Sequence, residues 1–316
     1  MANYVVGVDL GGTQVRAALV DREGMIHARE KTLTLPEEGL EAVLGRIYRC
    51  ATRVMQSVAP EDIQGIGIGA PGPLNPWTGV ILEAPNLGGW HHVPLAHLVE
   101  EHFELPTRLG NDANLAALAE RRFGAGRGST DMIYMTISTG IGGGIIVDEE
   151  LLLGARGLAG EIGHQTIEAS GPRCNCGNTG CLEVLASGPA IARRTVERLR
   201  GGAASIIPAL VDGDLDKITA AHVSEAASGG DSLATEMLRL AGFYIGVGIV
   251  NLIHIFNPEL FVIGGGVSKS GDLLFDAIRQ VVNERTMISM REGVRIVPAS
   301  LGDDVGLLGA ACLLLS

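Results

Sequence analysis

Two glycine-rich connections between apolar strands constrain the fold of this chain more than any other feature. Residues 4–10 and 13–20 are predicted strands joined by Gly11-Gly12, and 132–138 and 145–147 are predicted strands joined by the run 139–144. A two-residue Gly-Gly connection is typical of a hairpin, because the tight turns between antiparallel strands need φ > 0. Each hairpin opens a run of strands and then helices. This repeat predicts a duplicated α/β fold of two domains, with the hairpins facing each other across a cleft.

The same connections have the features of a phosphate-binding site. Exposed hairpin amides beside a hydroxyl can cradle phosphate oxygens, and a neighbouring carboxylate can hold Mg²⁺, usually through water. A third glycine run, 264–266, follows the predicted strand 260–263 and precedes a predicted helix over 272–285, whose N-terminus would face a ligand. Each run alone could be a tight turn, but the three together favour a nucleotide. The candidate residues are Asp9, Gly11, Gly12, Thr13, Thr139, Gly140, Gly142, Gly143, Gly265 and Gly266.

A cluster of metal-binding residue types lies in the segment 161–183. His164 is followed by Cys174, Cys176 and Cys181. Three thiolates and one imidazole form a closed four-ligand set, which is how a structural Zn²⁺ site is built. The alternative is a disulfide, but a Cys174–Cys176 bridge would be strained and would leave a third cysteine unpaired. Ligand number and type therefore favour zinc.

Carboxylates flank this metal motif and recur at a predicted strand end. An imidazole bound to a metal through one nitrogen keeps an N–H donor on the other. With Glu161 and Glu183 as acceptors, His164 would suit a hydroxyl-rich ligand such as a sugar, although both glutamates could simply be solvated. Asp112 follows the predicted strand 106–109 and opens an apolar helix, so it is either a helix cap or a general base. Asn111 beside it can donate and accept toward hydroxyls.

Composition bounds the possible functions. A chain of 316 residues with 46% hydrophobic and 19% charged residues is expected to form two well-packed domains. The net charge of −12 argues against nucleic acid as the main partner. The excess of 45 glycines suggests backbone held close to a ligand. We interpret Cys50 and Cys312, which lie in helical apolar patterns, as small core residues.

The chain is also expected to be soluble and cytoplasmic, without a membrane span. Its most apolar stretch, 241–256, is shorter than the ~18 residues a span needs and contains Asn251 and His254. The sequence passes from Met1 almost directly into the first predicted strand, so we expect no signal peptide.

The remaining pattern predicts the elements around these motifs. We expect strands over 63–69 and 294–298 and helices over 94–103, 187–200, 231–254 and 304–315. The glycine-, alanine- and serine-rich segment 201–230 is expected to be a connection with one short helix.

At this level of detail the chain resembles the ROK family (repressors, uncharacterised frames and sugar kinases) over essentially its full length. The central signature of the family is met within 137–164, with Ser138 where many members have glycine. The pattern G-x-x-C-x-C-G-x-x-G-C-x-E is met from Gly171 to Glu183. The segment PNLGGW at 85–90, which includes Asn86, looks more like the bacterial glucokinases of the family than the fructokinases.

The resemblance implies an actin-like, hexokinase-like (ribonuclease H-like) fold with ATP and sugar in an interdomain cleft. The smaller domain would comprise 1–116 plus 303–316, and the larger domain 117–302. Asp112 would be the catalytic base, with the metal ligands named above. The sugar contacts would be Asn86, Asn111, Asp112, Glu161, His164 and Glu183.

The expected activity is ATP-dependent phosphorylation of the 6-hydroxyl of glucose, with Mg²⁺, a structural Zn²⁺ and a homodimer or homotetramer by analogy with the family. Fructose, mannose or N-acetylmannosamine are alternative substrates. A sugar-sensing regulator is opposed by the acidic charge and by the absence of a helix-turn-helix region ahead of the first strand. An actin-like nucleotide switch has no use for the metal motif, and a zinc-knuckle nucleic-acid binder would need basic and aromatic neighbours.

Overall fold

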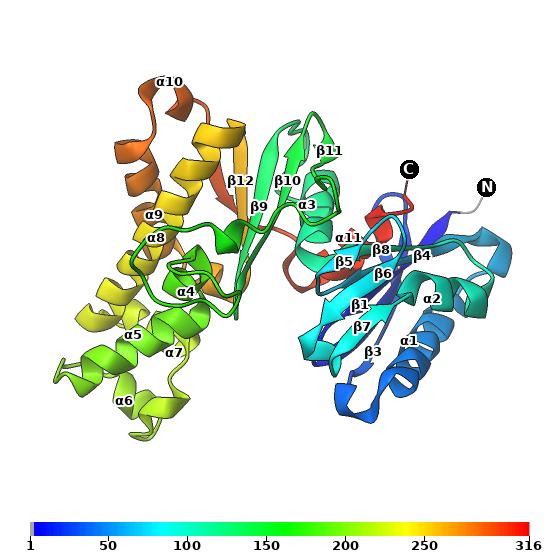
Figure 1. The fold of residues 1–316 in the computed structure, drawn as a ribbon, viewed down its shortest axis with the longest axis horizontal. Coiled ribbons are helices and arrows are strands. Elements are labelled where there is room, and N and C mark those ends of the chain that lie inside the picture. The colour runs from blue at the N-terminus through cyan, green and yellow to red at the C-terminus, as the bar shows by residue number, and fades with distance from the viewer. Residues whose placement is uncertain (1–2, 316) are drawn as a thin grey trace.

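The computed structural model describes residues 3–315, which form two lobes (Figure 1). Each lobe is built on a five-stranded mixed sheet, with the orders β3-β2-β1-β4-β8 and β11-β10-β9-β12-β13. In both sheets an antiparallel meander of three strands is extended by two parallel strands on the side of its first strand. The identical order confirms the predicted duplication.

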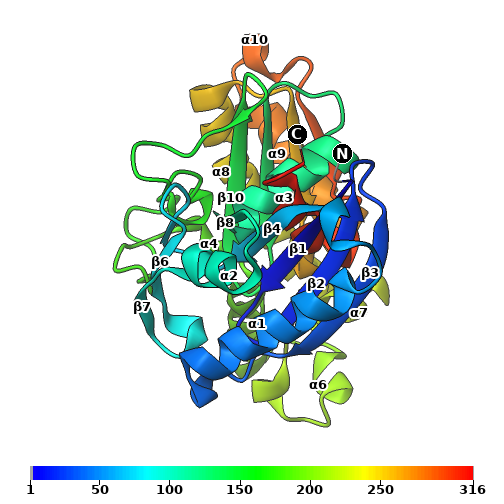
Figure 2. The ribbon, with the colours of Figure 1, turned by 90° about the vertical axis from the view of Figure 1, so that its right-hand side faces the viewer.

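The first lobe has its sheet covered by a long amphipathic helix, α1, on the outer face (Figure 2). A small second sheet, β5-β6-β7, continues from the strand β4. The elements of this lobe are β1 (Tyr4–Leu10), β2 (Gln14–Asp21), β3 (Ile26–Leu33), α1 (Leu40–Met55), β4 (Ile63–Ala70), β5 (Leu74–Asn75), β6 (Val80–Ala84), β7 (Trp90–Val93), α2 (Leu95–Phe103) and β8 (Thr107–Asn111), with 3₁₀ turns at Pro36–Glu38, Pro60–Asp62 and Pro85–Leu87.

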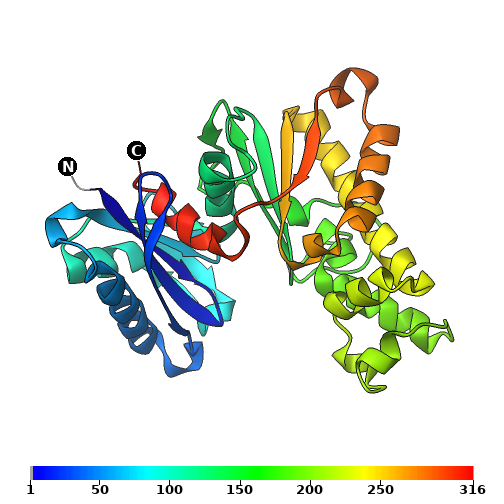
Figure 3. The same cartoon turned by 180° about the vertical axis from the view of Figure 1, so that it is seen from behind.

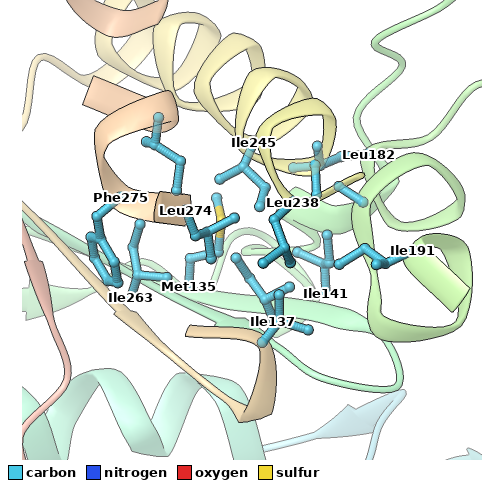
Figure 4. Packing of buried hydrophobic residues seen from close by; sticks show 14 of the residues in the cluster. Met135, Ile137, Ile141, Leu182, Ile191, Leu238, Ile245, Ile263, Leu274 and Phe275 are labelled. Carbon is cyan, nitrogen blue, oxygen red and sulfur yellow. The ribbon is translucent and has the colours of Figure 1, made fainter. Parts of the chain in front are cut away.

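The second lobe packs helices α4, α5, α8 and α9 on one face of its sheet. Figure 4 shows Met135 and Ile137 of β9 meeting Leu238 and Ile245 of α8 in this core. The elements are β9 (Met132–Ile137), β10 (Ile141–Val147), β11 (Glu150–Leu151), α4 (Leu182–Ala186), α5 (Gly188–Arg200), α6 (Ile207–Leu210), α7 (Ala220–Ser228), α8 (Ser232–Phe256), β12 (Leu260–Gly264), α9 (Asp272–Arg285), α10 (Ile288–Arg291) and β13 (Arg295–Pro298), with 3₁₀ turns at Ile162–His164, Leu215–Lys217, Gly266–Ser270 and Gly302–Asp304.

Two helices lie between the sheets and join the lobes, α3 (Asp112–Phe123) and α11 (Val305–Cys312). Seen from behind, the chain crosses from β13 to α11, which lies between the lobes (Figure 3). α11 packs on β1, β4 and α3, and glycines permit the approach. A Cβ at Gly67 would lie 1.8 Å from the carbonyl oxygen of Ala310, and one at Gly309 would lie 2.4 Å from that of Leu115. These glycines therefore serve packing rather than ligand binding, which corrects the expectation drawn from glycine content.

The fully buried carboxylate of Glu120 binds the chain segment between β13 and α11 to α3. Glu120 Oε1 accepts hydrogen bonds from the backbone N–H groups of Ser300 and Leu301, both at 2.9 Å. Its Oε2 accepts from Ala125 N at 2.8 Å and from Ser300 Oγ at 3.3 Å. A buried carboxylate needs hydrogen-bond donors, and these backbone groups supply them, so Glu120 fixes the chain between β13 and α11 on the end of α3.

We expect Glu120→Ala to be strongly destabilising. The substitution removes the acceptor of three part-buried N–H donors, at about 1 kcal/mol each, so the free energy of unfolding should fall by about 2–4 kcal/mol. Urea denaturation measures this loss. Glu197→Ala, at an exposed position on α5, is the control and should change the stability by less than about 0.5 kcal/mol. A loss of unfolding free energy for Glu120→Ala no larger than that of the control would contradict the proposed role of Glu120 in holding residues 300–301 on α3.

Both predicted hairpins exist, but their geometry differs from the prediction. Leu10 pairs with Val15, so the first connection is wider than two residues, and neither Gly11 nor Gly12 takes a positive φ. A glycine at position 12 is favoured by packing instead, because a Cβ there would lie 3.0 Å from the carbonyl oxygen of Asn86. In the second hairpin the strand already begins at Ile141, so 142–144 are strand residues rather than part of the connection. Their lack of side chains lets α3 and Ile162 pack directly on β10.

One further expectation is corrected. The segment 201–230 contains α6, α7 and a 3₁₀ turn, where one short helix was expected. The helix predicted over 272–285 is confirmed as α9, and the third glycine run is separated from it by the 3₁₀ turn Gly266–Ser270. The predicted domain limit between 116 and 117 falls inside the continuous helix α3, and the domain boundaries remain a proposal.

α8 is long and apolar enough to cross a membrane by length and composition alone. It extends well beyond the apolar stretch 241–256 on which the sequence estimate was based. The helix packs against α4, α7 and α9 and contributes buried side chains to the core of the second lobe. We interpret α8 as a core helix.

Candidate functional site

A cavity of about 580 Å³ opens where the carboxyl end of β8 faces the β9–β10 hairpin. Ligands of α/β sheets gather at the carboxyl ends of parallel strands, so the position agrees with a binding site. Both lobes contribute to its wall. The lining residues are Pro71, Gly72, Pro73, Asn111, Asp112, Ala113, Thr136, Ser138, Thr139, Gly140, Ile141, Gly142, Gly143, Leu158, Ala159, Gly160, Glu161, His164 and Glu183.

Asp112 is the first residue of α3, and it is not the helix cap. That role belongs to Asn111, whose side-chain oxygen accepts from Ala113 N at 3.0 Å and Asn114 N at 3.2 Å. The Asn111 amide therefore has only its NH₂ group left to donate into the cavity. Asp112 Oδ1 accepts from Ala113 N at 2.8 Å, and the side chain is open to the cavity. This arrangement settles the choice between cap and free carboxylate in favour of a free carboxylate.

The Asp112 carboxyl group is less acidic than usual. Its removal from bulk water within the cleft raises its pKa from 3.8 to about 6, although the side chain remains accessible from the cavity. The negative charges of Asp9 and Glu161 raise the pKa further, while the hydrogen bond from Ala113 N opposes them. A carboxylate with this pKa is ionised near neutral pH and is also basic enough to accept a proton.

We expect turnover to depend on this ionisation. Because the base must be unprotonated, kcat/KM should be level above pH ~7 and should fall below pH ~6 towards a tenfold loss per unit of pH. The raised pKa of Asp112, about 6, sets the position of this fall. A pH–rate profile from pH 5 to 8 measures it. A profile that stays level down to pH 5 would contradict the raised pKa.

Glu161, His164 and Glu183 lie together on the second-lobe wall, as predicted. Glu161 precedes the 3₁₀ turn Ile162–His164, which brings its Oε2 to 3.9 Å from His164 Nε2. Glu183, in the first turn of α4, accepts a hydrogen bond from Ile141 N at 2.9 Å through Oε2. A Cβ at Gly140 would lie 2.5 Å from that oxygen. Glu183 therefore also holds the β9–β10 hairpin, and its second oxygen is left for a ligand.

The four predicted metal ligands converge. The ligand atoms of His164, Cys174, Cys176 and Cys181 all lie within 4.8 Å of one another. Cys176 Sγ and Cys181 Sγ are 3.7 Å apart, and Cys174 Sγ lies 3.8 Å from His164 Nδ1. Edges near 3.8 Å are those of a tetrahedron around Zn²⁺ with Zn–S bonds of about 2.3 Å, whereas a disulfide needs about 2.05 Å. The donor set fits zinc, with Nδ1 of His164 toward the metal and Nε2 toward the cavity.

The metal loop is attached to the core helix α8 through two hydrogen bonds. Tyr244 donates to Glu168 Oε1 at 2.5 Å, and Asn251 donates to Gln165 Oε1 at 3.3 Å. Sequence reasoning missed both pairs, because nothing local to the cysteine motif indicates which helix it will meet.

A second cavity of about 480 Å³ adjoins the first at Ser138 and Thr139. Its wall is mainly apolar and comes from α5, the start of α7 and the third glycine run. The other lining residues are Gly188, Pro189, Ala192, Ile218, Thr219, Ala220, Ala221, Gly266 and Val267. A flat base suits such a wall, which agrees with the predicted role of Gly266. Gly265 is tightly packed instead, because a Cβ there would lie 2.3 Å from the carbonyl oxygen of Ile137.

The first hairpin lies apart from both cavity walls. Among the described residues that line them, Asp9, Gly11, Gly12 and Thr13 do not appear, and neither does Asn86. Asp9 is held by Arg16, whose Nε donates to Asp9 Oδ2 at 2.9 Å, but its charge still acts on Asp112. The proposed contacts of these five residues with ligands therefore remain predictions that depend on movement of the lobes.

The cavity wall also contains two segments that sequence reasoning left out. Pro71, Gly72 and Pro73 follow β4 in the first lobe, and residues 158–160 precede Glu161 in the second. The proximity of Pro71 to the end of a predicted parallel strand was the available signal. For the segment 158–160, the only available signal was its closeness to Glu161 in the sequence.

Comparison with known proteins agrees with this geometry. A model of the ROK family matches residues 5–316. The glucokinase of Thermotoga maritima is 37% identical over 310 residues, covering 98% of this chain and 96% of the relative. The xylose repressor of Caldicellulosiruptor bescii is 33% identical over 314 residues, covering 99% of this chain and 78% of the repressor. The structure of a ROK family glucokinase from Streptomyces griseus in complex with glucose and AMPPNP superposes with a TM-score of 0.84 at 38% identity, covering 98% of this chain and 99% of the other. The protein described here belongs to the ROK family.

Proposed function

We propose that this chain is an ATP-dependent glucokinase that phosphorylates the 6-hydroxyl of glucose. The observation that carries the proposal is the carboxylate of Asp112, with its raised pKa, which lines the same cavity as Glu161 and His164. The names of the relatives support the same activity, since the Thermotoga maritima protein is a glucokinase and the Streptomyces griseus structure contains glucose and AMPPNP.

In the proposed reaction, Asp112 Oδ accepts the proton of the sugar hydroxyl as that oxygen attacks the terminal phosphorus of ATP, and the bond from this phosphorus to the β–γ bridging oxygen breaks to release ADP. Glu161 and Glu183 accept hydrogen bonds from other sugar hydroxyls, and His164 Nε2–H and the Asn111 NH₂ group donate. Phosphoryl transfer depends mainly on positioning and charge neutralisation. The protein therefore holds the sugar in place and positions Asp112 as a base beside the 6-hydroxyl. Its cleft excludes water when the lobes close.

Two metal ions complete the proposal. Zn²⁺ would be held by His164, Cys174, Cys176 and Cys181 and would fix the loop that carries the sugar-binding groups. Mg²⁺ would accompany ATP and neutralise phosphate charge, with Asp9 as its nearest carboxylate on the first hairpin.

The nucleotide is proposed to span both cavities. Its base and ribose would lie against the apolar wall formed by Pro189, Ala220 and Gly266. Its phosphates would pass Thr139 and Gly140 towards Asp112. Gly11, Gly12 and Thr13 would approach these phosphates from the first lobe when the cleft closes.

A coupled assay with ATP and a panel of hexoses tests the proposal. Glucose should give the highest kcat/KM, and repetition with polyphosphate would define the donor. A higher kcat/KM for fructose, mannose or N-acetylmannosamine would indicate another kinase of the family. Sugar binding without turnover would favour the second candidate, a sugar-sensing regulator, which the match to the xylose repressor supports. We further propose a cytoplasmic homodimer or homotetramer, which light scattering after gel filtration would test.

A further inference from the structure

The first-lobe part of the cavity wall leads directly into a rigid turn. Pro71, Gly72 and Pro73 line the cavity, and the short strand β5 and the turn 75–79 follow at once. Asn75 Oδ1 accepts from Trp77 N at 3.0 Å and Thr78 N at 3.1 Å. Backbone bonds from Gly79 N to Asn75 O and from Ala96 N to Gly79 O close the turn and dock it on α2. Pro76 and Trp77 are thus presented on a preformed support.

The second-lobe part of the wall is the end of a loop, here called the Glu161 loop (residues 152–160). Leu152 N donates to Ile145 O at 2.8 Å, and Ala159 N donates to Leu153 O at 3.1 Å, which closes the base of the loop. Leu158, Ala159 and Gly160 line the cavity, and Glu161 follows them. A displacement of the loop tip is therefore transmitted within a few residues to the Glu161 carboxylate.

These two segments touch across the lobes. Gly157, at the tip of the Glu161 loop, is buried although the three residues before it are exposed. A Cβ on Gly157 would lie 2.3 Å from Pro76 Cδ and 3.4 Å from the Trp77 ring. Its φ of 75° is also one that side chains rarely adopt. The Trp77 side chain remains 58% exposed, which is unusual for so large an apolar group and leaves area to be buried on closure.

We propose that the Pro76–Trp77 turn is a latch that holds the tip of the Glu161 loop, so that Trp77 positions Glu161 for the sugar as the lobes close. The contact joins the two cavity-lining segments of opposite lobes outside the cavity itself. Sugar binding and lobe closure are therefore coupled through it. This inference rests on the proposed function, because it assigns Trp77 and Gly157 to the sugar side of that reaction and not to the nucleotide side.

The kinetic test uses Trp77→Ala and Gly157→Ala. Because only a small apolar contact is lost, Trp77→Ala should raise the KM for glucose about 3–5-fold. Gly157→Ala pushes the loop off the turn and should raise it about tenfold. The KM for ATP should not change, kcat should stay within about twofold, and the melting temperature of Trp77→Ala should match the wild type because the side chain is largely exposed.

Gly128→Ala is the matched control. Gly128 has a φ of 81° in the second lobe, and a Cβ there would meet nothing within 4 Å. The variant Gly128→Ala therefore has the same backbone strain as Gly157→Ala but makes no new contact with the other lobe. Its KM for glucose should equal that of the wild type.

Fluorescence gives a second readout that a purely structural role would not change. The chain has two tryptophans, Trp77 and Trp90. Trp90 is buried and its Nε1 has no hydrogen-bond partner among the described residues, so Trp90→Phe removes no bond and leaves Trp77 as the reporter. Glucose should shift Trp77 emission to shorter wavelength, and Gly157→Ala should abolish the shift.

Failure of the proposed function and failure of the latch give different results. No wild-type turnover of any hexose would reject the proposed function. Normal wild-type turnover of glucose, with KM values for Trp77→Ala and Gly157→Ala equal to that of Gly128→Ala, would reject the latch alone. Equal rises in the KM values for glucose and ATP would also reject it.

Discussion

Asp112→Asn is expected to lower kcat for glucose by a factor of about 10²–10⁴ while leaving the affinity for glucose nearly unchanged. Asparagine keeps the size and the hydrogen bond from Ala113 N but cannot accept the proton of the sugar hydroxyl at neutral pH. The remaining rate would come from positioning of the two substrates. Steady-state kinetics together with glucose binding measured by calorimetry separates the two effects.

The same variant should be more stable than the wild type at neutral pH. Burial raises the folded-state pKa of Asp112 above 3.8 to about 6, so the native state loses stability as pH rises through this window. Asparagine does not ionise. The melting temperature of Asp112→Asn should therefore exceed that of the wild type at pH 7.5, and the difference should shrink towards pH 4. Near-wild-type turnover would remove Asp112 from the role of base, and a lowered melting temperature at pH 7.5 would contradict the raised pKa.

Removal of the bound metal is expected to weaken glucose binding by about 10–100-fold, as the loss of groups that orient a site does. The four ligands hold the segment from His164 to Cys181, and His164 itself faces the cavity with Nε2. Without a metal, the imidazole loses its fixed tautomer and the loop between Glu161 and Glu183 loses its cross-link. Glucose affinity of protein treated with a chelator, compared with protein reloaded with zinc, measures the effect.

Two cysteine variants control this experiment. Cys181→Ser removes one ligand and should lower both the metal content and the affinity for glucose. Cys312→Ala, at a cysteine in α11 outside the cluster, should retain one equivalent of metal and wild-type affinity. Metal-free protein that binds glucose as tightly as the loaded form would contradict the proposed role of the zinc.

Sequence patterns predicted the parts of this molecule that depend on local chemistry. The cysteine and histidine spacing predicted four ligand atoms that do converge. The recurrence of a glycine hairpin predicted two sheets that do share one strand order. Asp112 was predicted at the end of a parallel strand, and the structure finds it on the wall of the cavity. In each case neighbours in the sequence carry most of the information.

What sequence reasoning missed depends on contacts between distant segments. Gly144 belongs to the run 139–144 that was expected to approach a nucleotide, yet a Cβ there would meet Ala113, Asn114 and Ala117 of α3. No sequence pattern singled out Glu120, and only the return of residues 300–301 to α3 shows that its buried carboxylate holds them. The first hairpin lines neither cavity, and its local pattern of glycines could not show this because the position of one lobe against the other is set by distant contacts.

The central claim is that a metal-braced loop holds the sugar with its 6-hydroxyl beside Asp112. A crystal structure with glucose and a non-hydrolysable ATP analogue tests it most directly. The account predicts the sugar oxygen O6 within hydrogen-bond distance of an Asp112 carboxylate oxygen, with Glu161 and His164 Nε2 on other hydroxyls. Glucose bound outside this cavity, or His164 in contact with neither metal nor sugar, would contradict it.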